Sequence, residues 1–112
     1  MNAMNMSALP GLARVRARFL DMMPARLQEI ESACFETKDP YAARQGLNKA
    51  QTILHQIAGS AGTLGFARFG DEARRVEELI VDYFKDGEPS ADLILIDLRR
   101  FTDQADQMLG KV

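Results

Sequence analysis

Residues 47–64 read LNKAQTILHQIAGSAGTL. Their apolar side chains recur three and four residues apart, which is the spacing that places them on one face of a helix. That face consists of Leu47, Ala50, Leu54, Ile57, Ala61 and Leu64. The stretch therefore predicts a helix with a single buried face, which has to pack against other amphipathic elements of the chain.

The same spacing occurs in three further segments, and turn-forming residues separate the segments. We expect helices over residues 11–35, 40–64, 67–85 and 90–110. Asp39 followed by Pro40 is typical of an N-cap and the first position of a helix. Gly65 is a stop signal for the second helix, Gly87 ends the third, and Ser90 caps the fourth.

Four amphipathic helices with short connections predict an all-α fold, an antiparallel four-helix bundle. The expected buried faces of the other helices are Leu12, Val15, Phe19, Leu27, Ile30 and Cys34 in the first, Phe69, Ala73, Val76, Ile80 and Tyr83 in the third, and Ile94, Leu98, Phe101, Ala105 and Met108 in the fourth. Pro24 lacks an amide hydrogen and clashes with the preceding turn, so we expect an additional short or kinked N-terminal helical segment. We assign residues 10–112 to the bundle and residues 1–9, which carry no charge, to a flexible N-terminal tail.

Composition argues against several classes of protein. The 112 residues suffice for one domain. Fourteen Lys and Arg residues against 16 Asp and Glu residues give a net charge of −2, whereas nucleic-acid binders carry a basic excess. No apolar run approaches the roughly 20 residues of a membrane span. One Cys and one His cannot form an intrachain disulfide or a four-ligand zinc site, so we expect no metal site and a cytoplasmic protein in which Cys34 is a buried thiol.

His55 directly follows Leu54 of the apolar face and therefore lies on the flank of its helix. The residues one or two turns away on the same side are Gln51, Thr52, Ala58, Gly59 and Gly62. Helical side chains lean towards the N-terminus, so the small residues at positions 58, 59 and 62 are those that would cover the imidazole. A glycine inside a helix costs about 1 kcal/mol relative to alanine. The bare surface beside His55 therefore predicts access for a large partner.

The same glycines also allow a second interpretation. Gly59, Gly62 and Gly65 recur every three residues, and small residues at this spacing permit another helix to cross closely. The chain would then be a scaffold or dimerisation bundle with a glycine packing face, and His55 would be an ordinary polar surface residue. Burial or exposure of these glycines distinguishes the two interpretations.

The run from His55 to Phe66 resembles the signature of histidine-containing phosphotransfer (HPt) domains, the four-helix modules of bacterial two-component phosphorelays. The positions that match the family pattern are His55, Gly59, Ser60, Ala61, Leu64, Gly65, Phe69, Ala73 and Glu77. The resemblance in helix number and spacing covers roughly residues 10–110. The chain departs from the pattern at Ala58, where the family usually has a lysine that helps to neutralise the phosphoryl group. The candidates for a compensating cation are Lys49, Arg68 and Arg75, or the lysine and bound Mg²⁺ of the partner.

The resemblance implies a phosphoryl carrier. Nε2 of His55 would accept a phosphoryl group from the aspartyl phosphate of a receiver domain and pass it to another receiver. The expected contacts around this nucleophile are Gln51 and Thr52, which would hydrogen-bond the phosphoryl oxygens or the imidazole. Asn48, Gly59, Gly62 and Phe66 are the expected docking residues. The family implies that the receiver supplies Mg²⁺, so we expect no cofactor of the chain's own. We expect response-regulator receiver domains as partners, a hybrid histidine kinase as a further candidate partner, and a monomeric chain.

Other features have simpler interpretations. The sequence contains no Gly-x-x-x-x-Gly-Lys-Ser/Thr loop, so we expect neither ATP binding nor kinase activity. The paired acids Asp71 with Glu72 and Glu77 with Glu78 have the pattern of solvated helix faces rather than of catalytic dyads.

Ala58 also leaves open a receiver-binding adapter that has kept the bundle and lost the phosphotransfer.

Overall fold

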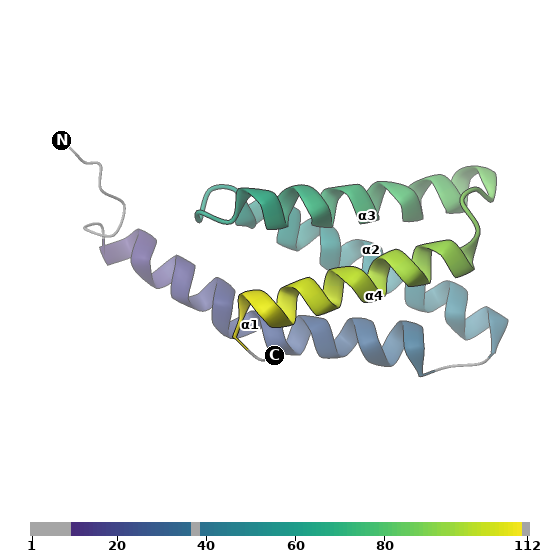
Figure 1. The fold of residues 1–112 in the computed structure, drawn as a ribbon, viewed down its shortest axis with the longest axis horizontal. Coiled ribbons are helices and arrows are strands. Elements are labelled where there is room, and N and C mark those ends of the chain that lie inside the picture. Colours follow the sequence, from purple (N-terminus) through teal and green to yellow (C-terminus); the bar gives the residue numbers. More distant parts are fainter. Residues whose placement is uncertain (1–9, 37–38, 111–112) are drawn as a thin grey trace.

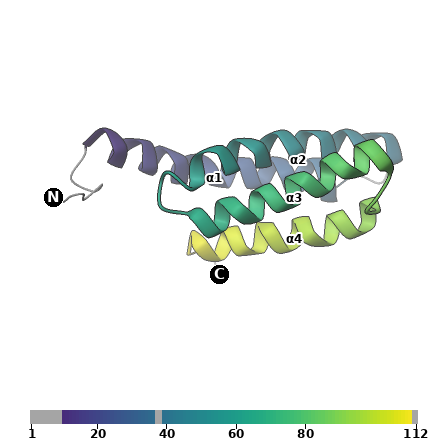
Figure 2. The same ribbon diagram turned by 90° about the horizontal axis from the view of Figure 1, so that it is seen from above.

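The computed structural model describes residues 10–36 and 39–110. It contains four helices, α1 (Pro10–Phe35), α2 (Pro40–Ala61), α3 (Ala67–Asp86) and α4 (Ala91–Met108), and the described residues include no strand. Helix α2 packs between α1 and α3, and α4 contacts both α3 and α1. Consecutive helices run in opposite directions (Figures 1 and 2). The predicted all-α helical bundle is therefore confirmed, whereas the tail predicted for residues 1–9 lies outside the described residues.

The sequence left open a kink at Pro24 or a separate short helix in the N-terminal part of the bundle. Helix α1 is one helix of 26 residues with Pro24 inside it, so there is no separate N-terminal segment in the described part of the chain. Figure 1 shows the helix axis changing direction near its middle, which is where a proline removes a donor and crowds the preceding turn. The N-terminal half projects past the other helices (Figures 1 and 2). The assignment of Val15 to the core was wrong for this reason, because 53% of its surface is exposed.

The predicted caps are present. Asp39 accepts a hydrogen bond from the Tyr41 amide at 3.4 Å, with proline at the start of α2. The Ser90 hydroxyl accepts one from the Leu93 amide, also at 3.4 Å. Gly87 ends α3 in the left-handed conformation, with φ of 78°. The start of α2, the end of α3 and the start of α4 therefore follow from local capping chemistry.

Helix α2 ends at Ala61, three residues before the predicted end. Gly62 is its C-cap, and the prediction that Gly62 lies inside the helix was wrong. The Phe66 amide donates to the Ala61 carbonyl at 2.8 Å, and Gly65 has φ of +94°. Three glycines within seven residues weaken the helix here, and the positive φ at Gly65 is one that glycine adopts at little cost.

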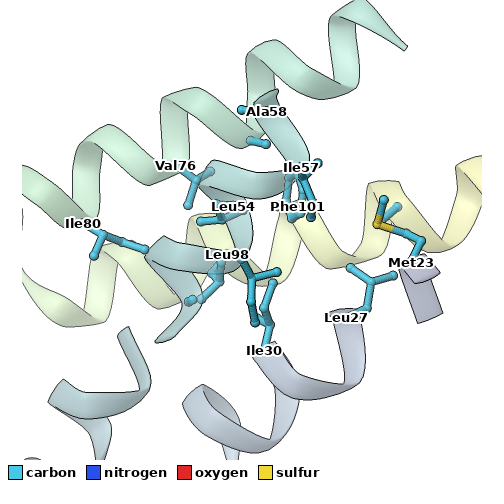
Figure 3. Close-up of a cluster of buried hydrophobic side chains, with 14 of the residues drawn as sticks. Met23, Leu27, Ile30, Leu54, Ile57, Ala58, Val76, Ile80, Leu98 and Phe101 are labelled. Carbon is cyan, nitrogen blue, oxygen red and sulfur yellow. The ribbon is translucent and has the colours of Figure 1, made fainter. Parts of the chain in front are cut away.

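The core lies along the axis of the bundle, where side chains from all four helices converge (Figure 3). Each residue of the predicted α2 face is at most 3% exposed. Met23, which the sequence analysis did not assign to the core, is also fully buried. Cys34 is buried as expected, and desolvation raises the pKa of its thiol to about 11. The buried face fixes the rotation of α2 about its own axis. His55, the residue after Leu54, therefore points away from the core.

No helix in the described part of the chain is long and apolar enough to cross a membrane.

Candidate functional site

His55 lies on the outer side of α2, beside α3. Its neighbour Leu54 is fully buried, and one step along a helix rotates the next side chain by about 100°. The imidazole consequently reaches solvent, with 75% of its side-chain surface exposed. The exposure predicted from the sequence pattern is thus present.

A carboxylate from α3 holds the imidazole. Nδ1 of His55 lies 2.9 Å from Oε2 of Glu77, whose side chain is only 13% exposed. The amide of Gln51 donates to the same oxygen at 3.1 Å. An ionised carboxylate only accepts hydrogen bonds, so Nδ1 carries the hydrogen and donates it to Glu77.

The other ring nitrogen, Nε2, faces away from this contact. In the neutral ring with its hydrogen on Nδ1, Nε2 of His55 keeps its lone pair. No residue in the described ranges, 10–36 and 39–110, forms a hydrogen bond with Nε2. The site therefore presents an imidazole whose ring orientation is set by Glu77 and whose Nε2 has no hydrogen-bond partner among the described residues.

An open groove of about 450 Å³ runs between α2 and α3 at this point. It is lined by His55, Ala58, Gly59, Arg74, Glu77, Glu78, Val81 and Asp82. Arg74 is the one cation among these residues, and its nearest carboxylate is that of Asp71 at 3.8 Å. The groove is acidic towards Asp82 and has its positive charge at the end near Gly59.

No other helix in the described part of this chain packs on the glycines beside His55. A Cβ built at Gly59 or Gly62 would have no atom within 4 Å. The close helix contacts are instead at Gly46, where a Cβ would overlap the Ala33 carbonyl, and at Gly70, where it would lie 3.0 Å from the Ala61 Cβ. The geometry fits the access interpretation of Gly59 and Gly62, since no described residue of this chain packs on them.

The remaining predicted site residues have other contacts. The Thr52 hydroxyl donates to the Asn48 carbonyl at 3.4 Å, and both residues are exposed on α2 without lining the groove. Phe66 stacks on Phe19 with ring centroids 5.6 Å apart, and the Arg16 guanidinium lies 4.9 Å from its ring centroid. Phe66 thus anchors the α2–α3 turn to the projecting half of α1.

The three cations named from the sequence do not line the groove that contains His55. Lys49 pairs with Glu29 of α1 at 3.5 Å. Arg75 faces α4, and its pKa is raised by its hydrogen bond to Glu72 and then by Asp97. Arg68 lines a separate groove between α3 and α4. Arg74, which the sequence analysis did not single out, is the cation that the fold brings to the site.

The interpretation of Glu77 as part of a solvated face was wrong, since its carboxylate is largely buried against His55. Its exposed neighbour Glu78 fits that interpretation. Glu77 occupies the acidic position of the family pattern, and this match singles it out from the other acidic residues of the helix. The charge pattern alone does not distinguish Glu77 from Glu78. The described residues include no group of three or more His, Cys, Asp or Glu side chains arranged to hold a metal ion.

Comparisons with curated proteins and with solved structures returned no match. The family model of the Hpt domain matches residues 14–111, which include almost all of the four helices. Hpt domains are phosphocarrier modules of two-component phosphorelays, are not kinases, and interact with receiver domains. On this match, which covers nearly the whole chain, the protein belongs to the Hpt domain family.

Proposed function

We propose that His55 is the residue that carries the phosphoryl group, accepting it from the aspartyl phosphate of one receiver domain and passing it to the aspartate of another. The observation that carries this proposal is the pairing of Nδ1 with Glu77 at 2.9 Å on a side chain that is 75% exposed. The contact with Glu77 fixes the ring through Nδ1 and leaves Nε2 accessible to a second protein. This is the arrangement that a nucleophile in a transfer between two proteins needs.

The transfer is an in-line displacement at phosphorus. The Nε2 lone pair forms the new P–N bond while the P–O bond to the receiver aspartate breaks, and the aspartate leaves as a carboxylate. Nδ1 keeps its hydrogen, so the phosphorylated ring is an imidazolium whose positive charge lies beside the Glu77 carboxylate. The reverse steps deliver the phosphoryl group to the second receiver. Such transfer depends on positioning and on charge neutralisation more than on covalent work by the protein.

The surface around His55 suits the approach of a receiver. Side chains at positions 59 and 62 would lean towards the N-terminus and cover the imidazole of His55. Both positions are glycine, so this part of the surface is open. Asn48 and Thr52 extend the exposed flank of the same helix. We expect the receiver to supply Mg²⁺ and its own lysine at the reacting phosphoryl group.

A second candidate function is a receiver-binding adapter without phosphotransfer. Ala58 in place of the usual lysine favours it, as do the acidic side chains of Glu78 and Asp82 in the groove, which repel a phosphoryl group. The adapter would bind a receiver through the same face and leave His55 unmodified.

Phosphotransfer from labelled receivers separates the two functions. The protein is incubated with phosphorylated receiver domains encoded in the same genome, and the label on the chain is tested for the acid lability and base stability of a phosphoramidate. We expect label on the wild type, none on His55→Gln, and wild-type labelling of Gln107→Ala, an exposed control on α4. A receiver that binds both the wild type and His55→Gln but labels neither would establish the adapter instead.

A further inference from the structure

We propose that Arg74 supplies the positive charge that neutralises a phosphoryl group on His55, in the place of the lysine that this chain lacks at position 58. The inference rests on the proposed function, since it concerns the phosphorylated state of His55. It is carried by the position of Arg74 in the groove, by the space beside it and by the charges that surround it.

The register of α2 against α3 brings Arg74 to the vacant position. The two helices are antiparallel, and His55 contacts Glu77. Moving three residues forward on α2 and three residues back on α3 pairs Ala58 with Arg74, and both residues line the groove with His55. The contact of a Cβ at Gly70 with Ala61 continues the same register towards the turn. A cation from α3 thus stands opposite the position from which the family's lysine acts.

Small residues leave room for this guanidinium. Ala58 is 9% exposed and ends at its Cβ, and a Cβ at Gly59 would meet nothing within 4 Å. No bulky side chain of α2 therefore separates Arg74 from the exposed edge of the imidazole. An arginine side chain is long enough to reach across such a surface and presents several N–H donors that match phosphoryl oxygens.

Arg74 is also weakly held in the unmodified protein. Its ion pair with Asp71 is 3.8 Å long, joins residues three apart on one helix, and is exposed on both sides. Exposed pairs of this kind contribute little to stability, so the guanidinium is available to a more highly charged anion. Arg75, the next residue, is instead committed to both Glu72 and Asp97.

The charges of the groove favour a cation beside the phosphoryl group. Apart from His55, the titratable groups that line it are Arg74, Glu77, Glu78 and Asp82, all from α3. Glu77 faces the imidazolium, which leaves Glu78 and Asp82 to repel the phosphoryl group. Among the described residues that line the groove, Arg74 alone can offset this repulsion, and an arginine–phosphoryl pair is a strong, charge-assisted contact.

The test uses the full chain phosphorylated by phosphoramidate, a small donor that removes receiver docking from the experiment. The phosphoryl group is followed by ³¹P NMR in the wild type, in Arg74→Gln, in Arg74→Lys and in the double variant Ala58→Lys with Arg74→Gln. Arg68→Gln is the matched control, because it removes the same charge from the same helix at a different groove.

We expect loss of the cation to raise the titration midpoint of the phosphoryl group by about 0.5–1 unit in Arg74→Gln. The half-life of phosphorylated His55 near neutral pH should fall by about threefold, because a phosphoramidate is more labile when protonated. Arg74→Lys and the Ala58→Lys double variant should recover most of both effects, and Arg68→Gln should match the wild type.

Two different failures are distinguishable. If the wild type is phosphorylated on His55 and Arg74→Gln has the same midpoint and half-life, the role of Arg74 is overturned and the proposed function stands. If neither phosphoramidate nor any receiver phosphorylates His55 in the wild type, the proposed function fails and the role of Arg74 fails with it.

Discussion

The Nδ1 atom of His55 on α2 lies 2.9 Å from the Oε2 atom of Glu77 on α3. This contact joins an exposed ring to a nearly buried carboxylate, so one side of the imidazole is fixed by the bundle while the other faces solvent. Gln51 binds the same carboxylate oxygen and limits its movement. The pair thus sets the orientation of the ring and points Nε2 towards solvent.

Removal of this carboxylate should slow phosphotransfer without unfolding the bundle. In Glu77→Ala, we expect a mixture of ring tautomers and about a tenfold lower transfer rate, which corresponds to the loss of a charge-assisted hydrogen bond worth about 1.5 kcal/mol. ¹⁵N NMR of the histidine ring reports the tautomer, and transfer from a phosphorylated receiver reports the rate. Asp103→Asn is the control, since it removes an exposed carboxylate of α4 that does not line the groove. An unchanged tautomer in Glu77→Ala would show that the carboxylate does not orient the ring.

A side chain at position 59 should separate stability from function. Gly59 has open space around it, and leucine is the better helix former, so we expect Gly59→Leu to keep or gain up to about 1 kcal/mol of unfolding free energy. The new side chain would lean over His55 and obstruct the receiver, so transfer should fall at least about tenfold. Urea denaturation and the transfer assay measure the two effects. Normal transfer to Gly59→Leu would mean that receivers dock elsewhere.

The reverse result is expected at Gly46. A Cβ there would overlap the Ala33 carbonyl, so Gly46→Ala has to push α1 away from α2. We expect a loss of about 1–3 kcal/mol of unfolding free energy in urea denaturation. Transfer measured where the variant is still folded should be close to that of the wild type, because Gly46 is remote from the groove. A stability equal to that of the wild type would show that α1 and α2 have room for a methyl group between Gly46 and Ala33.

The buried thiol of Cys34 should make stability fall at alkaline pH. Desolvation raises its pKa from the ordinary value of 9.0 to about 11. Between these values the unfolded chain has released the proton and the folded chain retains it, so stability decreases as the pH rises. We expect the wild type to lose about 2–3 kcal/mol more than Cys34→Ala between about pH 8 and pH 11. Parallel pH profiles of the two proteins, measured by denaturant titration, would contradict this account.

Local chemistry made much of the fold predictable. The three- and four-residue spacing identified the α2 face, and the caps at Asp39 and Ser90 bind amides two and three residues further along the chain. Val15 has the correct spacing for the core, but it lies where α1 extends past its neighbours, and helix length relative to the bundle is not encoded in periodicity. The end of α2 was missed because the glycine-rich run weakens a helix gradually rather than at one residue.

The part of the site that lies on α2 was predictable from the sequence. The contribution of α3 was not. His55 and its small neighbours lie on α2, so helical geometry was sufficient to place them together. Glu77 and Arg74 come from α3, and their positions depend on the register between the helices, which follows from core packing. Their charges alone are typical of any solvated helix face, which is why Arg74 was not considered and Glu77 was assigned to solvent.

The central claim is that Nε2 of His55 carries the phosphoryl group, and ³¹P–¹⁵N correlation NMR tests it most directly. The ¹⁵N-labelled chain is phosphorylated by a receiver and the nitrogen bonded to phosphorus is identified. We predict a single phosphorus coupled to Nε2 of His55, with the hydrogen retained on Nδ1 opposite Glu77. Phosphorus coupled to Nδ1, or found on any other residue, would contradict the account.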